Sequence, residues 1–330
     1  MIRAVSSPNI ALIKYWGNRN DALRLPAADS LSMVLDTPTV EASVSAAETF
    51  AVASFHADGS ASPQSEKSIE RLQKHWGLVK TYLTGIGKAD GLPAEVSIVI
   101  RSAIPPAIGI ASSAAVFSCL GEAYAGFART PLTREEVSIL GRLGSGSGAR
   151  NSFGGFVALE NHGEGIGSAY GRQITDEHHW TLHDIIIVPS REEKKVGSTE
   201  GHANAATSPL FRERLRAIPE RMRGCIGALQ TKDFEKLRIV SEQDALDMHR
   251  VMETQTPALR YLSEDTHRIL RGIEAVRQSD HLHVLYTMDA GPTVHLLCTQ
   301  DSLKTVDDFA AAQKGCTVFR AKTGAPSRLI

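Results

Sequence analysis

Residues 104–115, Ile-Pro-Pro-Ala-Ile-Gly-Ile-Ala-Ser-Ser-Ala-Ala, constrain the fold more than any other part of the chain. They connect an expected strand at residues 95–101 to an expected helix at about residues 113–127. Gly109 lets the backbone approach a ligand closely, and the first amides of the helix near Ser112 have no acceptors within the helix. This geometry favours an anion site with phosphate as its ligand, although an ordinary capped helix would use the same residues.

The composition is that of a soluble globular protein with one large core or two α/β lobes. The chain has 330 residues, of which 42% are hydrophobic and 22% are charged. Lys and Arg number 36 against 37 Asp and Glu, so the formal net charge is −1 and no overall positive field attracts nucleic acid. An acidic ligand must therefore be bound by local cations.

The cysteines and the N-terminus bear on the cellular compartment. Cys119, Cys225, Cys298 and Cys316 are scattered and form no C-x-x-C pair, so we expect reduced thiols and no zinc site. The first residues lack the apolar stretch of a secretory signal, and no window is apolar for long enough to span a bilayer. These features predict a cytoplasmic enzyme without a membrane partner.

Helical and strand patterns alternate along the chain, which predicts an α+β fold built as two α/β layers. A second lobe is expected to begin near residue 182, giving lobes at 1–181 and 182–330. Thr133 followed by Glu136 indicates a helix start, and that helix should stop at the glycines from Gly144. Further helices are expected at residues 65–83, 210–229, 234–248, 256–276 and 302–313. Further strands are expected at residues 157–159, 184–188, 282–288, 293–297 and 317–321.

A second glycine-rich segment at residues 144–156 contains Ser145, Ser147 and Ser152 around Arg150. It is not a dinucleotide fingerprint, because a helix precedes it and a strand follows it, and the chain has no G-x-x-x-x-G-K-[ST] run. Its many small residues argue against a place in the core. The planar guanidinium of Arg150 and the neighbouring hydroxyls could bind a carboxylate. Alternatively, the segment is a solvated loop in which Arg150 forms a structural salt bridge.

Two further segments carry candidate chemistry. Asp289 ends a strand and precedes Gly-Pro, so it is either a turn residue or a catalytic carboxylate that contacts a substrate hydroxyl. Lys14 follows an apolar strand and lies near Asn9 and Tyr15, a set suited to phosphate or hydroxyl contacts. Alternatively, Lys14 belongs to a core strand and its side chain reaches water.

Five motifs, in this order, resemble mevalonate diphosphate decarboxylases of the GHMP kinase superfamily. They are N-I-A-L-I-K-Y-W-G at 9–17, G-I-A-S-S-A-A at 109–115, G-S-G-S-G-A-R at 144–150, G-S-T-E-G at 197–201 and Y-T-M-D-A-G-P at 286–292. The resemblance implies a GHMP kinase-like fold in which two lobes flank a deep active-site cleft. It also implies an enzyme of the mevalonate pathway of isoprenoid synthesis that uses ATP and Mg²⁺. The resemblance further implies that this enzyme is a homodimer.

The resemblance implies phosphorylation of a tertiary 3-hydroxyl, followed by loss of that phosphate together with CO₂. Asp289 would orient or deprotonate the hydroxyl, Lys14 would lie near the transferring phosphate, and Arg150 would hold the substrate carboxylate. The remaining substrate contacts would come from Asn9, Tyr15, Asn18, Ser147, Ser198 and His202. The ATP phosphates would be bound by Pro106, Gly109, Ala111, Ser112 and Ser113, of which the two serines would lie near Mg²⁺.

Two departures from the family pattern bear on the substrate. Asn18 stands where the diphosphate-using enzymes carry a second lysine, and His202 stands where many relatives carry Met. The lost cation favours 5-phosphomevalonate as substrate and isopentenyl phosphate as product, unless Arg19, Lys194 or Lys195 compensates. The alternatives are diphosphomevalonate with isopentenyl diphosphate as product, or a mevalonate 3-kinase type of reaction without decarboxylation. The presence of both Asp289 and Lys14 argues for the complete reaction.

Overall fold

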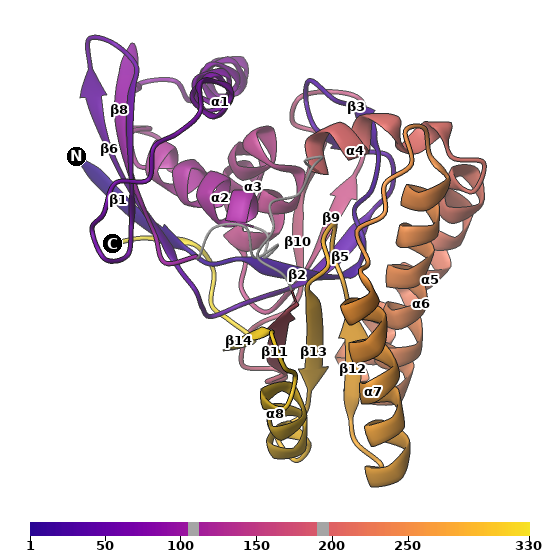
Figure 1. Ribbon diagram of the computed structural model, residues 1–330. Coiled ribbons are helices and arrows are strands. Elements are labelled where there is room, and N and C mark those ends of the chain that lie inside the picture. Colours follow the sequence, from indigo (N-terminus) through magenta and orange to yellow (C-terminus); the bar gives the residue numbers. More distant parts are fainter. Residues whose placement is uncertain (105–111, 190–197) are drawn as a thin grey trace.

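The computed structural model describes residues 1–104, 112–189 and 198–330, and it combines mixed helices and sheets as expected. A five-stranded sheet has the order β15-β1-β6-β8-β7. The neighbouring strands β1 and β15 bring the two ends of the chain to the same side (Figure 1). Its strands are β1 (Ile2–Ser6), β6 (Val40–Ala47), β7 (Ala51–His56), β8 (Glu95–Ser102) and β15 (Arg328–Leu329).

Two four-stranded sheets continue the structure. One has the order β10-β9-β5-β2, with β2 (Asn9–Ile13), β5 (Ser30–Val34), β9 (Phe156–Asn161) and β10 (Ala169–Thr175). The other has the order β12-β13-β11-β14, with β11 (His183–Val188), β12 (Val284–Thr287), β13 (Val294–Cys298) and β14 (Thr317–Lys322). A short hairpin pairs β3 (Asn18–Asn20) with β4 (Leu25–Pro26).

Helices cover these sheets. In the first half of the chain they are α1 (Glu66–Gly85), α2 (Ser112–Ala125), α3 (Arg134–Gly144) and the 3₁₀ helix η1 (Gly146–Ser152). In the second half they are α4 (Ser198–Asn204), η2 (Ala205–Thr207), α5 (Phe211–Thr231), α6 (Phe234–Thr254), α7 (Glu264–Asp280) and α8 (Leu303–Ala311). Helices α5 and α6 lie side by side, and α6 packs against both β2 and β12 (Figure 1).

The alternation of side chains along β11 divides the hydrophobic core. Ile186 and Val188 belong to the large cluster that also fills the first two sheets. Ile185 and Ile187 point to the opposite face and join a second cluster that includes residues of α7 and α8. Because both faces are covered, all the strand residues from Ile185 to Val188 are buried, as the continuous apolar run predicted.

Local capping signals fix several helix ends where the sequence placed them. The Ser65 side chain accepts from the Ser68 amide at the start of α1, and Thr133 forms a complete capping box with Glu136 at the start of α3. The helix expected at residues 256–276 is present as α7, but it begins only at Glu264, so the expected start was wrong. A proline at 257 disfavours helix in the residue before it, and Ser263 supplies the cap instead.

The second glycine-rich segment is buried, contrary to the sequence prediction. It forms η1, in which Gly146, Gly148 and the residues from 149 to 152 are all shielded from solvent. The small residues permit this packing, because a Cβ atom on Gly148 would lie 3.0 Å from the carbonyl oxygen of Gly141 in α3. The segment is therefore a closely packed support rather than a surface loop.

All four cysteines are free thiols, as expected, and three of them are buried. Across residues 1–104, 112–189 and 198–330, no helix is both long enough and apolar enough to cross a membrane.

A glycine-to-alanine substitution should have opposite effects on stability at two helical positions, one at the contact between α3 and η1 and one away from it. Gly141→Ala would place Cβ 2.9 Å from the backbone oxygen of Gly148, and overpacking of this kind destabilises by about 1–3 kcal/mol. Gly227→Ala in α5 meets open space, and it should stabilise by about 0.5–1 kcal/mol because alanine favours helix. Urea denaturation of both variants measures the difference; equal stabilities would contradict the proposed packing constraint.

Candidate functional site

An ion pair between the ends of two strands lies at the centre of the site. Lys14 follows β2 directly, and its Nζ donates to Asp289 Oδ1 at 2.7 Å and to the Ala11 carbonyl at 2.7 Å. Asp289 lies two residues beyond the end of β12. The Lys14 side chain is 1% exposed and that of Asp289 is 28% exposed, so the carboxylate is the partner that a ligand can reach.

Burial and charge act in opposite directions on both groups of this pair. Burial lowers the pKa of Lys14, while Asp289 and Asp244 oppose that effect. Burial alone would raise the pKa of Asp289, but Lys14, followed by His295 and Arg150, holds it below its ordinary value. The Asp289 carboxylate therefore stays ionised at neutral pH and can accept a hydrogen bond from a hydroxyl.

Helix α6 fixes the backbone of Lys14. The Lys14 amide donates to Asp244 Oδ2 at 2.7 Å, and Asp244 is itself fully buried. Arg214 donates to the same oxygen at 3.0 Å and to the Lys14 carbonyl at 3.2 Å, while Arg221 donates to Asp244 Oδ1 at 2.9 Å. The position of the Lys14 side chain therefore depends on a charged network that joins β2, α5 and α6.

Arg150 of η1 is buried close to this pair. Its Nη1 donates to Ser30 Oγ at 2.6 Å and its Nη2 to Asn9 Oδ1 at 3.2 Å, while Asn9 Nδ2 donates to the Ser147 carbonyl at 3.0 Å. The buried Nε of Arg150 has no hydrogen-bond partner among the described residues. Burial lowers the pKa of Arg150 to about 10, opposed by Asp289 and Tyr15, so it remains a cation.

A row of hydroxyls links the start of α2 to η1. Ser113 Oγ lies 3.2 Å from Ser145 Oγ, which lies 3.3 Å from Ser147 Oγ. Ser112, the first residue of α2, is exposed. The other residues expected to bind ATP phosphates, Pro106, Gly109 and Ala111, lie outside the described residues.

The turn after Lys14 is held by His202 of α4. The His202 ring lies 4.3 Å from the Tyr15 ring and 4.5 Å from the Trp16 ring, and its Nδ1 accepts from the Gly17 amide at 3.0 Å. Burial lowers the pKa of His202 to about 3, so the ring is neutral and supports the turn by packing. Ser198 begins α4, but its side chain lies outside the described part of the chain.

The polar atoms of the Asn18 side chain form hydrogen bonds with other protein groups. Its Oδ1 accepts from the Tyr15 hydroxyl, and its Nδ2 donates to Asp21 Oδ1 at 2.7 Å. Arg19, one of the cations expected to compensate for Asn18, pairs with Glu164 at 3.4 Å. The other two, Lys194 and Lys195, belong to the segment that the structure does not describe.

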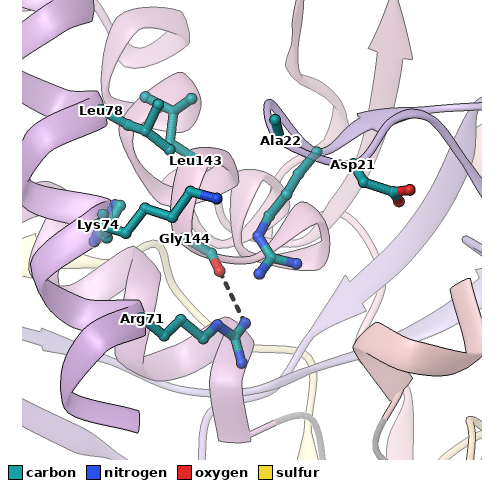
Figure 2. A pocket seen from close by; sticks show the side chains of 9 residues that line it. Asp21, Ala22, Arg71, Lys74, Leu78, Leu143 and Gly144 are labelled. Carbon is teal, nitrogen blue, oxygen red and sulfur yellow. Dashed lines mark hydrogen bonds between the residues drawn. The ribbon is translucent and has the colours of Figure 1, made fainter. Parts of the chain in front are cut away.

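A basic pocket next to Asp21 was missed by the sequence reasoning. It has a volume of about 40 Å³ and is lined by Asp21, Ala22, Arg24, Arg71, Lys74, His75, Leu78, Leu143 and Gly144. Figure 2 shows Arg71 and Lys74 extending from α1, with Arg71 Nη2 donating to the Gly144 carbonyl at 2.8 Å. Burial, and to a smaller extent repulsion from the Arg24 cation, lowers the pKa of Arg71 to about 10. An anion would relieve this repulsion.

The i, i+3 spacing of Arg71 and Lys74 places both cations on one face of α1, and this was the available sequence signal. Their approach to Arg24 depends on tertiary packing. The structure therefore gathers Lys14, Asp289, Arg150 and Asn9 at one centre and adds a set of cations next to the Tyr15 turn.

Two family models match the chain. The diphosphomevalonate decarboxylase-like N-terminal domain matches residues 6–169, and the mevalonate 5-diphosphate decarboxylase C-terminal domain matches residues 184–320. The diphosphomevalonate decarboxylase of Rattus norvegicus is 32% identical over 323 residues, which cover 94% of this chain and 79% of the rat protein.

Solved structures match over the whole chain. Mevalonate diphosphate decarboxylase from Staphylococcus aureus has a TM-score of 0.88 and 26% identity, covering 100% of this chain and 97% of its own. A complex described as MDDEF with MVAPP, AMPPCP and magnesium has a TM-score of 0.87 and 26% identity, covering 99% of this chain and 98% of its own. These similarities confirm the α+β, GHMP kinase-like fold.

The central ion pair predicts a pH-dependent loss of stability. Lys14→Met removes the nearest cation from Asp289, so the pKa of that carboxyl should rise. A carboxyl group whose pKa is lowered by folding stabilises the folded protein at every pH above the pKa that the group has in the unfolded chain. The variant loses this contribution. We expect a loss of about 2–3 kcal/mol at pH 7, below the value for a fully buried pair because the Asp289 side chain is 28% exposed.

The loss should shrink toward pH 4 as the Asp289 carboxyl of the variant becomes protonated, and urea denaturation across this range measures it. The double variant Lys14→Met/Asp289→Asn removes both charges and is the control. It should be more stable at pH 7 than Lys14→Met alone. Equal instability of the two variants at every pH would show that packing, rather than charge, is lost.

Proposed function

The chain belongs to the diphosphomevalonate decarboxylase family, and we propose that it converts diphosphomevalonate and ATP into isopentenyl diphosphate, ADP, phosphate and CO₂. One observation carries the proposal. The ion pair of Lys14 and Asp289, 2.7 Å long, lies close to the buried Arg150 guanidinium. This arrangement offers an acceptor for a hydroxyl, a cation for a transferring phosphate and a second cation for a carboxylate.

In the first stage, the substrate 3-hydroxyl donates to Asp289 and its oxygen bonds to the γ-phosphorus of ATP. The bond from that phosphorus to the bridging oxygen breaks, ADP leaves, and the hydroxyl proton passes to Asp289 or to solvent. Lys14 balances the charge of the transferring group. Phosphoryl transfer depends mainly on positioning and charge neutralisation, so no covalent nucleophile is required.

In the second stage, the C3–O bond breaks and phosphate leaves with the bonding electrons. The bond to the carboxylate carbon then supplies the electrons of the new C=C bond, and CO₂ departs. Arg150 would hold the carboxylate in line with the breaking C–O bond, supported by Asn9 and Ser147. Because phosphate is the leaving group, no cofactor that accepts electrons is needed.

The residues at the start of α2 fit a nucleotide-bound Mg²⁺. Ser113 and Ser145 offer hydroxyl oxygens 3.2 Å apart, and Mg²⁺ prefers oxygen ligands. The described residues contain no group of three or more His, Cys, Asp or Glu side chains that could hold a metal. The ATP phosphates would therefore supply most ligands, with Ser113 and the exposed Ser112 nearby. Bound Mg²⁺ would neutralise phosphate charge.

The preference for 5-phosphomevalonate, drawn from Asn18, is not supported by the comparisons. The similar proteins are diphosphomevalonate decarboxylases, and one solved relative is described with MVAPP. The basic pocket favours the same substrate, because Arg24, Arg71 and Lys74 supply cations near the Tyr15 turn although position 18 is neutral. We therefore propose the diphosphate.

Three features expected from the sequence and the family resemblance remain predictions. They are the homodimer, the cytoplasmic location and the division into lobes at 1–181 and 182–330.

The central role of Asp289 can be tested by removing its charge. Asp289→Asn should lower the rate of CO₂ release by about 10²–10⁴-fold, because the amide cannot accept the hydroxyl proton. Release of ADP and of CO₂ from diphosphomevalonate measures both stages, and circular dichroism checks the fold. Full activity of the variant would leave Asp289 as a turn residue. ADP release without CO₂ from the unaltered protein would identify a kinase instead.

The substrate tail can be tested at the basic pocket. Arg24→Gln and Arg71→Gln should each raise KM for diphosphomevalonate about tenfold, with a smaller effect on 5-phosphomevalonate, because each removes a charge-assisted phosphate contact. Lys67→Gln, also on α1 but outside the pocket, is the control and should leave KM unchanged. Equal effects on the two substrates, or a preference of the unaltered protein for the monophosphate, would contradict the proposed substrate.

A further inference from the structure

The segment that connects β14 to β15, residues 323–327, contacts the short helix that carries Arg150. In Figure 1 it is part of the yellow trace that leads from β14 toward the C label, and it ends where β15 pairs with β1. The Ser327 amide donates to the Asn151 carbonyl at 2.8 Å. The segment therefore binds the residue that directly follows Arg150 in η1.

Asn151 connects this contact to the side chain of Arg150. Asn151 is fully buried; its Oδ1 accepts from Asn9 Nδ2, and its Nδ2 donates to the Ser7 carbonyl. Asn9 Oδ1 in turn accepts from Arg150 Nη2 at 3.2 Å. Because one amide side chain, that of Asn9, binds both Asn151 and Arg150, a shift of Asn151 would move an acceptor of the guanidinium.

The Ser327 hydroxyl is buried beside a carboxylate of α2. Ser327 is 2% exposed, and its Oγ donates to Glu122 Oε1 at 2.7 Å. The same Oγ accepts from Ser118 Oγ at 3.0 Å. Since both its donor and its acceptor are used, the hydroxyl is fixed in one orientation.

Arg134, the first residue of α3, joins these groups to η1. Its Nη2 and Nη1 donate to the two oxygens of Glu122 at 2.7 Å and 3.2 Å. Its Nε donates to the Ser152 carbonyl at 2.8 Å, and its Nη2 donates to the Ser327 carbonyl at 3.1 Å. One guanidinium thus binds α2, the last residue of η1 and the segment after β14. We call Glu122, Arg134 and Ser327 the Ser327 cluster.

The Ser327 cluster restrains the chain on one side of Arg150. It binds Asn151 and Ser152, whereas Ser138 Oγ binds the Ala149 carbonyl on the other side at 2.7 Å. Apolar side chains could stabilise the same packing, because replacing a buried ion pair with them is often neutral or stabilising. Directed hydrogen bonds on both sides instead fix one position, and a displacement of about 1 Å can slow a reaction about 10²-fold.

We propose that the Ser327 cluster is a positioning element for Arg150, which fixes η1 so that the guanidinium holds the substrate carboxylate in line with the breaking C3–O bond. The inference rests on the proposed function, in which Arg150 acts in the second stage. The hydrogen bonds described above connect the cluster to Arg150 through Asn151 and Ser152.

The two stages of a single turnover test this role. Glu122→Met/Arg134→Met leaves no single charge buried, so it should fold, which circular dichroism checks. At saturating diphosphomevalonate and ATP, CO₂ release should slow about tenfold and ADP formation less than about twofold, because only the second stage needs the aligned carboxylate. Ser327→Ala, a milder variant, should slow CO₂ release about threefold. Glu160→Met/Arg172→Met, which removes another bidentate pair, is the matched control and should change neither rate.

Binding of diphosphomevalonate without ATP, measured by calorimetry, tests the link to Arg150 without turnover. Arg150→Met should weaken binding by removing the carboxylate contact. In the Glu122→Met/Arg134→Met background the same substitution should weaken binding at least about threefold less, because the guanidinium is already displaced.

Equal slowing of the two stages in the cluster variants, or additive effects on binding, would overturn the proposal and leave the cluster structural. The same split between ADP and CO₂ in the control pair would overturn it equally. If the unaltered protein released no CO₂, the proposed function would fail, while the calorimetric comparison would still decide this inference.

Discussion

The contact between Lys14 and Asp289 is the interaction on which the site depends. Burial acts against the charge of each group, and each group stabilises the charged form of the other. The pair exists because two distant parts of the chain meet: Lys14 at the end of β2 and Asp289 beyond β12. Asp244 fixes the Lys14 backbone from α6, so the packing of α6 on both strands is also a condition for the chemistry.

Close backbone packing provides the second condition. Glycines in α3 and η1 let the two elements approach, and Ser138 Oγ of α3 donates to the Ala149 carbonyl at 2.7 Å. This contact holds the residue that precedes Arg150, whose guanidinium is then anchored by Ser30 and Asn9. A buried cation needs such anchoring, because a guanidinium that was free to move would turn toward water and away from the ligand site. Small residues therefore contribute to the site by immobilising a large one.

Local signals in the sequence were sufficient for elements whose boundaries are set by neighbours in the chain. Ser65 and the Thr133–Glu136 capping box fixed two helix starts, and the apolar run at 184–188 gave a buried strand. The motifs also singled out Lys14, Arg150 and Asp289, which the structure does bring close together.

Long-range contacts explain what the sequence did not reveal. The burial of η1 depends on a partner in α3, and the pocket of Arg24 and Arg71 depends on a turn and a helix far apart in sequence. The contact of Ser327 with Glu122 is visible only once the path of the chain after β14 is known. Asn18 led the sequence reasoning to a monophosphate because the other cations near that turn could not be located without the fold.

The distribution of charge connects these observations. The chain carries a net charge of only −1, yet the site concentrates cations around a single carboxylate. In the proposed reaction each anionic part of the substrate has its own cation: the transferring phosphate has Lys14, the carboxylate has Arg150, and the tail has Arg24 and Arg71. Asp289 lies among these positive charges and is the proposed acceptor of the hydroxyl proton. Its ionisation is therefore controlled by the same cations that bind the substrate, so any change that weakens binding at Lys14 or Arg150 also changes the basicity of Asp289.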